Sequence, residues 1–391
     1  MRIAMIGQKG IPAIYGGVER HVHDLSVRLV ERGHEVTVYA RKWYTAEHGM
    51  GQVEGVTRVH TPTIKTKHLD TIVHVFTSTI HAIFSSYDVI HYHGVGPALL
   101  AWIPRVFRPR VRVIVTLHSL DRFHQKWNGF AKFMLKLGEK AAHTFADDTI
   151  TVSKSLQKYI NAEYKARTIY IPNGVEIPSP VTSISHITSF GLTSDKYIVM
   201  ISRLVPHKGA HVLIEAFKKL KERNADNASV QELKLAIVGG AAYTDEYVRS
   251  LHVSAASVND VVFTDFQSGT SLNGLYSHAR VLVHPSINEG LPITVLQAMS
   301  HGIPVLLSAI PEHEEILSDA SMFFKENDVE SLVSRLESFM KLSKEDRVHI
   351  GKQNKAIIHE KYEWEHIVSQ IEGVYQGVQL QSHEVLSTVK A

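Results

Sequence analysis

The sequence predicts an α/β protein with two Rossmann-like, doubly wound domains facing a central cleft. At 391 residues the chain exceeds the size at which a single core usually divides. In each half, short apolar strands alternate with longer helical stretches, a pattern typical of a parallel sheet with helices on both faces. Ligands of such sheets bind at the carboxyl ends of the strands, so we expect the functional residues there.

The first domain is predicted over residues 1–175. Its strands cover 2–6, 35–40, 88–91, 111–117 and 148–152, and its helices cover 19–31, about 71–85 and 129–142. The apolar part of the first ten residues is too short for a signal peptide and forms the first strand. No apolar run is long enough to span a membrane.

The second domain is predicted over residues 195–360, after a linker at 176–194 that is rich in Pro, Ser and Thr. Its strands cover 197–202, 233–238, 260–263, 281–284 and 304–308, with helices between them. Residues 361–376 form an amphipathic helix that needs an apolar partner surface. We expect this last segment, 361–391, to cross back to the first domain.

The charge is unevenly distributed along the chain. Residues 1–180 carry 23 Lys and Arg against 14 Asp and Glu, a formal charge of +9, whereas residues 181–391 carry −6. The first half is therefore expected to meet an anionic partner. The absence of Cys excludes disulfides and thiolate metal sites and fits a cytoplasmic protein.

The stretch 284–304 combines a strand end, an acidic loop and a short helix. Pro292 suits the first helical position, and Gly302 with Pro304 ends the helix. A helix start attracts phosphate, while Glu289 and Gln297 are placed to hold the hydroxyls of a sugar and a ribose. The alternative is an ordinary strand-loop-helix unit of an α/β domain.

Arg203 and Lys208 follow the first strand of the second domain, and Lys208 opens the next helix. Two cations and a helix dipole at one point suit a diphosphate leaving group, whose charge rises as the sugar bond breaks. The alternative is a solvated surface pair.

Glycines and histidines lie at predicted strand ends of the first domain. Gly16 and Gly17 allow close approach of a ligand to the start of a helix that carries Glu19 in its first turn. His118 and Asp121 follow the strand 111–117. His91 and His93 lack a third ligand at useful spacing, so no metal site is predicted.

The segment EGLPITVLQAMSHGIP resembles the E-x7-E motif of retaining glycosyltransferases of family 4, which have the GT-B fold. The pair Arg203 and Lys208 matches the family's R-x4-K spacing, and GIPAIYGGVE is similar to members that build bacterial surface polysaccharides. The resemblance implies retaining transfer of a sugar from a nucleoside diphosphate sugar to a glycan or lipid-linked acceptor. It implies no metal or other cofactor, and no nucleic acid is expected as a partner.

The resemblance also implies residue roles. Catalytic roles fall to Glu289, Arg203, Lys208 and His118. Donor binding falls to Gly16, Gly17, Arg203, Lys208, Glu289, Gly290, Leu291, Pro292 and Gln297. Asp121 and Glu19 are assigned to the acceptor side. Gln297 departs from the family pattern, which has a second Glu; an amide binds paired ribose hydroxyls more weakly. A GT-B epimerase and an inactive nucleotide-sugar-binding protein are the alternatives.

A basic amphipathic helix is predicted within residues 126–140. Its apolar positions are Trp127, Phe130, Phe133, Met134 and Leu137, and its basic positions are Lys126, Lys132, Lys136 and Lys140. The nearby Arg105, Arg108, Arg110 and Arg112 add charge. We expect peripheral, reversible binding to the anionic inner face of the plasma membrane. The alternative is a domain helix whose apolar stripe is core.

Overall fold

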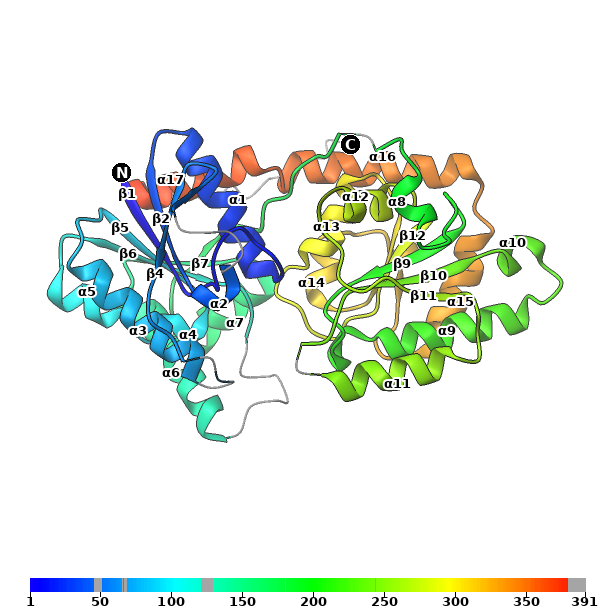
Figure 1. Cartoon of the computed structure of the whole chain (residues 1–391), viewed down its shortest axis with the longest axis horizontal. Coiled ribbons are helices and arrows are strands. Elements are labelled where there is room, and N and C mark those ends of the chain that lie inside the picture. Colours follow the sequence, from blue (N-terminus) through cyan, green and yellow to red (C-terminus); the bar gives the residue numbers. More distant parts are fainter. Residues whose placement is uncertain are drawn as a thin grey trace, which may run out of the picture. The chain divides into compact units, whose positions relative to one another are not determined.

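In the computed structural model the chain forms two compact units, each an α/β domain (Figure 1). Unit 1 comprises Met1–Val152, Gln157–Ile171 and Trp364–Ala391, and unit 2 comprises Ser153–Leu156 and Pro172–Glu363. The structure describes residues 1–45, 51–64, 66, 69–120, 129–179, 181–242 and 244–378. Within these ranges, every helix is too short or too polar to cross a membrane.

Unit 1 contains, over its described residues, an eight-stranded sheet in the order β3-β4-β2-β1-β5-β6-β7-β8. All neighbours are parallel except β3 and β4. Because β2 and β5 flank β1 on opposite sides, the topological switch point lies between β1 and β5. The strands are β1 (Arg2–Ile6), β2 (Glu35–Ala40), β3 (Gly51–Val53), β4 (Val56–His60), β5 (Val89–His93), β6 (Arg112–Leu117), β7 (Asp148–Thr151) and β8 (Ile169–Tyr170).

One face of this sheet is covered by the first and last helices of the chain. Apolar side chains of α1 and α17 share one core with β1, β2 and β5. Trp364, at the start of α17, is 3% exposed. The helices of unit 1 are α1 (Gly17–Glu31), α2 (Lys42–Thr45), α3 (Leu69–Ile83), α4 (Val95–Ala98), α5 (Trp102–Phe107), α6 (Gly129–Phe145) and α17 (Trp364–Gln376), with α7 (Lys154–Tyr164) beginning in unit 2.

Helix α17 is also fixed by charge. Arg32, which caps α1, forms ion pairs with Glu365 and Glu372 of α17. His34 Nε2 lies 2.6 Å from a carboxylate oxygen of Glu372. The amphipathic segment at the end of the chain thus finds its apolar partner in the core of unit 1.

Unit 2 contains, over its described residues, a six-stranded parallel sheet in the order β11-β10-β9-β12-β13-β14. Here β10 and β12 flank β9, so the switch point lies between β9 and β12. The strands are β9 (Tyr197–Ile201), β10 (Lys234–Val238), β11 (Val261–Phe263), β12 (Val281–His284), β13 (Val305–Ser308) and β14 (Phe323–Phe324).

The helices of unit 2 follow the expected alternation with strands. They are α8 (Ser185–Thr188), the 3-10 turn η3 (Pro206–Lys208), α9 (Ala210–Arg223), α10 (Ala228–Gln231), α11 (Asp245–Ala255), α12 (Gly269–Ser277), α13 (Ile293–Ser300), α14 (Pro311–Glu314), η4 (Ala320–Met322), α15 (Val329–Met340) and α16 (Lys344–Lys361). Helix α8 falls within the stretch interpreted as a linker. It packs against α12 and buries Ile187 completely, so part of that stretch is folded onto unit 2.

Candidate active site

The loops that follow β9 and β12 contact each other at the switch point of unit 2. The backbone N–H of Ile287 donates to the carbonyl of His207 over 3.0 Å. Gly209 has a φ of 76°, and a Cβ built there would lie 2.2 Å from the carbonyl oxygen of Pro285. Only glycine fits such a close approach without a shift of backbone. This contact brings the loop carrying Lys208 against the loop carrying Glu289.

Lys208, Glu289 and His284 form a buried charged cluster. Lys208 Nζ donates to Glu289 Oε1, and His284 Nε2 lies 2.8 Å from the same oxygen. The Glu289 side chain is 8% exposed. Burial alone would raise the pKa of Glu289, but Lys208 and His284 outweigh it and hold the pKa well below its usual value. Glu289 is therefore ionised at neutral pH, and His284 donates to it as a neutral ring because burial lowers its pKa.

The other predicted residues of unit 2 lie on the same loops or on the helix that follows. Arg203 follows β9 and is exposed. Gly290 is half-buried, and the carbonyl of the buried Leu291 accepts a 3.0 Å bond from Asn173 Nδ2. Pro292 is the N-cap of α13, so the helix begins one residue later than predicted.

Gln297 projects from α13 toward α12. The hydroxyl of Tyr276 donates to Gln297 Oε1 over 3.2 Å. Burial raises the pKa of Tyr276, which keeps this hydroxyl protonated. The sequence analysis did not identify Tyr276, because a buried tyrosine on a helix carries no local signal of function.

In unit 1, the loop after β1 is ordered by its own side chains. Gly16 has a φ of 107°, and a Cβ there would lie 1.9 Å from Glu19 Oε2. Glu19 is buried, accepts from the backbone N–H of Lys9 over 3.2 Å and lies 3.7 Å from its ammonium group. These contacts fix the loop and leave Gly17 exposed at the start of α1. The acceptor-side role of Glu19 stays a prediction.

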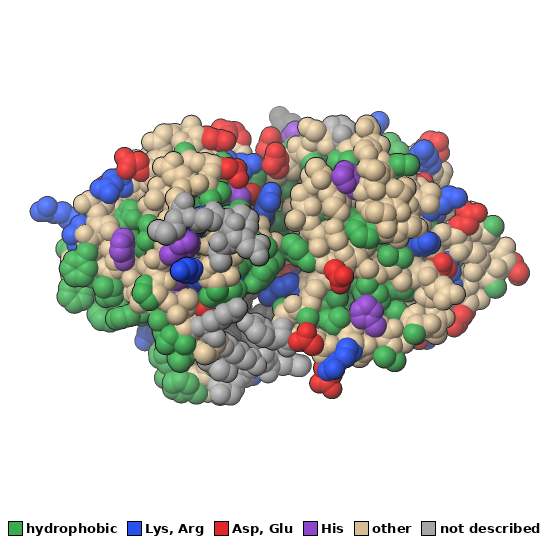
Figure 2. All heavy atoms as spheres, viewed as in Figure 1, with side chains coloured by type: hydrophobic (Ala, Val, Ile, Leu, Met, Phe, Trp, Pro, Cys, Tyr) green, Lys and Arg blue, Asp and Glu red, His purple; other side chains and the backbone are tan. Residues whose placement is uncertain are grey.

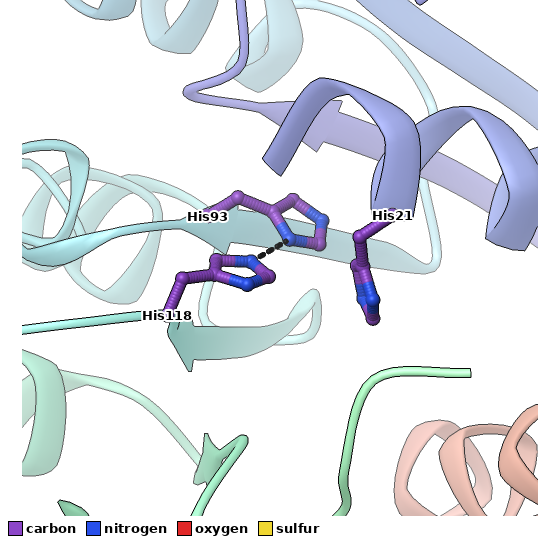
Figure 3. A group of neighbouring side chains, drawn as sticks. All are labelled: His21, His93 and His118. Atoms are coloured by element: carbon purple, nitrogen blue, oxygen red, sulfur yellow. Dashed lines mark hydrogen bonds between the residues drawn. The ribbon is translucent and has the colours of Figure 1, made fainter. Parts of the chain in front are cut away.

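Histidines gather at the switch point of unit 1 (Figure 3). His93 ends β5 and His118 directly follows β6, and His93 Nδ1 lies 3.2 Å from His118 Nε2. The ring of His21, from α1, lies 5.0 Å from that of His118, between centroids. Burial lowers the pKa of His93 and of His118 well below the usual value, so both rings are neutral at pH 7. The sequence analysis missed His21 because it lies on a different element, far from the others in sequence.

Aspartates of unit 1 also lie near the predicted strand ends. Asp147 and Asp148 form ion pairs with Arg105 and Arg112, at 2.7 and 2.5 Å. Asp121, assigned to the acceptor side, lies outside the described residues, as do Lys126 and Trp127 of the predicted amphipathic helix.

Comparisons with known proteins agree with this architecture. The model of Glycosyltransferase Family 4 matches residues 15–177, and the model of Glycosyl transferases group 1 matches residues 187–357. An uncharacterized glycosyltransferase of Methanocaldococcus jannaschii is 27% identical over 96% of this chain and 98% of its own length. A GDP-mannose-dependent alpha-(1-6)-phosphatidylinositol monomannoside mannosyltransferase of Mycolicibacterium smegmatis is 27% identical over 75% of this chain and 77% of its own length.

Among solved structures, HepE of Anabaena in complex with UDP and glucose superposes with a TM-score of 0.77 at 20% identity, covering 96% of this chain and 100% of its own. The fold is therefore GT-B, with two Rossmann-like domains. Together, the two family models cover most of the chain. The chain thus belongs to the family 4 glycosyltransferases, retaining enzymes that transfer a sugar from a nucleotide-sugar donor.

Proposed function

We propose that this enzyme transfers a hexosyl group from a nucleoside diphosphate sugar to a glycan or lipid-linked acceptor at an anionic membrane, in surface-polysaccharide synthesis. The observation that carries the donor half of this proposal is the Lys208–Glu289–His284 cluster at the switch point of unit 2. Open α/β sheets bind their ligands at that point.

Lys208 and Arg203 bind the negatively charged diphosphate. An ammonium group has three N–H donors, so Lys208 can hold Glu289 and still donate to a phosphate oxygen. Arg203 is exposed and adds a planar guanidinium suited to phosphate. The charge on the leaving diphosphate grows as its bond to the sugar breaks, so fixed cations stabilise the transition state more than the bound substrate.

Glu289 binds the hydroxyls of the donor sugar. An ionised carboxylate accepts strong hydrogen bonds from hydroxyl groups, and His284 with Lys208 fixes its position. Gln297 binds the ribose, while Gly17, at the start of α1, and His118 contribute to donor binding from unit 1.

The surface of unit 1 supports the proposal of a lipid-linked acceptor. Its apolar face, as we call it, consists of exposed side chains on or next to three helices: Ile72, Phe76 and Phe84 with α3, Trp102, Val106 and Phe107 of α5, and Phe130, Phe133 and Leu137 of α6. Helix α5 packs against both α3 and α6. Figure 2 shows hydrophobic side chains gathered over this part of unit 1. Exposed apolar patches of this kind mark interaction sites.

Helix α6 does not bury the predicted apolar stripe. Phe130 and Phe133 are 73% and 57% exposed, and the buried side of the helix consists of Gly138, Ala141 and Ala142 with Glu139. These values favour the membrane interpretation over a core stripe. The relative from Mycolicibacterium smegmatis, named for a phosphatidylinositol monomannoside, supports a lipid acceptor as well.

Basic side chains border the apolar face. Lys132, Lys136, Lys140 and Arg110 are exposed. Each contributes about 1 kcal/mol near an anionic surface, except Lys136, whose ion pair with Glu163 offsets its charge. Arg105 and Arg112 attract an anionic membrane less than the sequence suggests, because ion pairs with Asp147 and Asp148 offset their charge.

The transfer reaction is tested with a panel of nucleoside diphosphate sugars, with and without lipid extracts or oligosaccharides as acceptors. We expect free nucleoside diphosphate to appear only when a suitable acceptor is present, and the glycosidic bond formed to keep the anomeric configuration of the donor by NMR. Interconversion of the nucleotide sugar without acceptor would indicate an epimerase instead.

Membrane binding is tested by co-sedimentation with anionic and neutral vesicles at low and high salt. The double substitution Phe130→Ser with Phe133→Ser should weaken binding to anionic vesicles by about tenfold or more, since each buried aromatic side chain stabilises by about 1.5–3 kcal/mol. Val253→Ser is the matched control, because Val253 of unit 2 is 76% exposed. Equal binding to both vesicle types, or none at low salt, would contradict the proposal.

A further inference from the structure

Three histidine side chains of unit 1 converge at the carboxyl end of its sheet (Figure 3). His93 ends β5, His118 follows β6 and His21 lies on α1. Each offers one ring nitrogen, and the three nitrogens lie within 4.8 Å of one another. Two neighbouring strands and the helix after a third thus bring together a ligand set that no sequence spacing reveals.

The separations fit a tetrahedral ion. With metal–nitrogen bonds of about 2.0–2.1 Å, two imidazole nitrogens on a tetrahedral zinc ion lie about 3.3 Å apart. His93 Nδ1 and His118 Nε2 are already 3.2 Å apart. The nitrogen of His21 needs to approach by at most about 1.5 Å to complete the set.

The surroundings of His93 orient its ring. His93 Nε2 lies 3.4 Å from the sulfur of Met5, which directs Nδ1 toward His118. The ring of His91 lies 4.1 Å from that of His93, between centroids, and is itself held by Tyr375 and Thr116 at 2.7 Å each. Such outer contacts fix the orientation of metal-ligating imidazoles.

Access to the cluster comes through His118. His21 and His93 are each 2% exposed, whereas His118 is partly exposed. Three buried or partly buried imidazoles leave the fourth position of a tetrahedral ion for water. An all-imidazole set suits Zn²⁺ and its neighbours Co²⁺, Ni²⁺ and Cu²⁺, whereas Mg²⁺ and Ca²⁺ require oxygen ligands.

We propose that His21, His93 and His118 bind one transition-metal ion, Zn²⁺ in the first place, and that the bound ion inhibits sugar transfer. The ion has no part in the reaction itself, where Lys208 and Arg203 meet the charge of the leaving group. Inhibition follows because the metal holds the ring of His118. The inhibition rests on the proposed role of His118 in donor binding. The binding of the metal does not depend on that role.

Metal binding is measured on the full chain by calorimetric titration with Zn²⁺ and by the visible absorption of added Co²⁺. We expect one equivalent to bind, with the intense absorption of four-coordinate Co²⁺. His21→Asn and His93→Asn should each weaken binding at least 100-fold. The matched control is His359→Gln, which removes an exposed histidine 3.1 Å from Glu363 that could hold a metal at the surface.

The His359→Gln protein should bind as the unaltered protein does. Equal affinity in all four proteins would overturn the site. X-ray absorption of the unaltered protein with one equivalent of Zn²⁺ gives an answer even if a variant fails to fold. Three imidazole nitrogens at about 2.0 Å are expected. A shell rich in carboxylate oxygen would overturn the assignment.

The inhibitory half is measured as the ratio of transfer rates with and without Zn²⁺ for each protein. We expect a fall of at least tenfold at saturating Zn²⁺, reversed by a chelator and absent in His21→Asn. Unchanged transfer rates at saturating Zn²⁺ would overturn the proposed inhibition but would not contradict the metal site. A protein that binds the metal but transfers no sugar under any condition would contradict the proposed function instead.

Discussion

The two units share one architecture but place different chemistry at the same topological position. In both, the strand order reverses beside the first strand, and the loops at that point carry the candidate residues. Unit 2 places a buried ion pair there, with Lys208 and Glu289 locked together. Unit 1 places an ordered glycine loop and neutral histidines there. The shared fold thus sets the position of the candidate residues in each unit, and the side chains set their chemistry.

Their surfaces differ as well. Most of the exposed apolar side chains described in unit 1 lie on or next to α3, α5 and α6. Those described in unit 2 lie singly on separate segments: Ile184, Val253, Phe266, Ile287 and Val348. The first 180 residues carry +9 and the rest −6. This contrast is the reason for proposing that the acceptor and the membrane meet unit 1.

The largest effect is expected from the cations of unit 2. Arg203→Ala and Lys208→Ala should each lower kcat by about 10²–10³, the loss typical of removing one donor to developing charge. Lys196→Ala is the matched control, since Lys196 pairs with Glu232 at the surface of the same unit. Steady-state kinetics measure the effect, and unchanged rates in both variants would count against charge stabilisation by unit 2.

Glu289→Gln should reduce the free energy of unfolding by about 3 kcal/mol at pH 7, because it leaves Lys208 without its carboxylate. The folded-state pKa of Glu289 lies well below 4.5. The ionised carboxylate therefore stabilises the fold above pH 4.5, and this stability is lost as the pH falls through the folded-state pKa. Denaturant unfolding from pH 7 to 3 should show the two proteins converging in acid. A constant difference would argue against an ionised Glu289.

The attachment of α17 to unit 1 gives a smaller effect. Glu372→Gln should destabilise unit 1 by about 2 kcal/mol, since Glu372 accepts charge-assisted bonds from Arg32 and lies 2.6 Å from His34. Hydrogen exchange should rise in α1 and α17 and stay constant in the strands of unit 2. Glu360→Gln, an exposed change on α16, is the control. Faster exchange in unit 2 alone would contradict the assignment of α17 to unit 1.

The smallest effect is expected at Gln297. Gln297→Glu keeps an acceptor for the hydroxyl of Tyr276, so the local structure should hold. A carboxylate binds hydroxyls more strongly than an amide by about 1 kcal/mol, so donor affinity should rise about fivefold. A large gain of activity from zero would instead show that the natural protein is a degraded, inactive enzyme.

Many of the strands and helices, and the loops that carry the candidate residues, could be predicted because their sequence patterns are local. The alternation of strands and helices located the main strands, and the end of β12 placed Glu289 at the correct edge of the sheet. Contacts between residues far apart in the sequence have no such signal, as with His21 beside His93 and Tyr276 beside Gln297.

The charge at the candidate site was only partly predictable. The sequence suggested that Arg203 and Lys208 converge on a phosphate, but the structure pairs Lys208 with Glu289 and leaves Arg203 exposed. The pairing depends on the length of two loops and on the close approach at Gly209, which only the folded backbone defines. The contact between Glu19 and the backbone of Lys9, which orders their own loop, likewise depends on the folded backbone.

The central claim is that the switch point of unit 2 binds the diphosphate of the donor. Hydrogen–deuterium exchange with a saturating nucleoside diphosphate, chosen by thermal shift from a panel of bases, tests it most directly. At 100 times its dissociation constant the ligand stabilises the protein by about 2.7 kcal/mol. We expect slower exchange in residues 203–210 and 285–294, and no such protection in the Lys208→Ala protein. Protection confined to unit 1, or protection that survives in the Lys208→Ala protein, would contradict it.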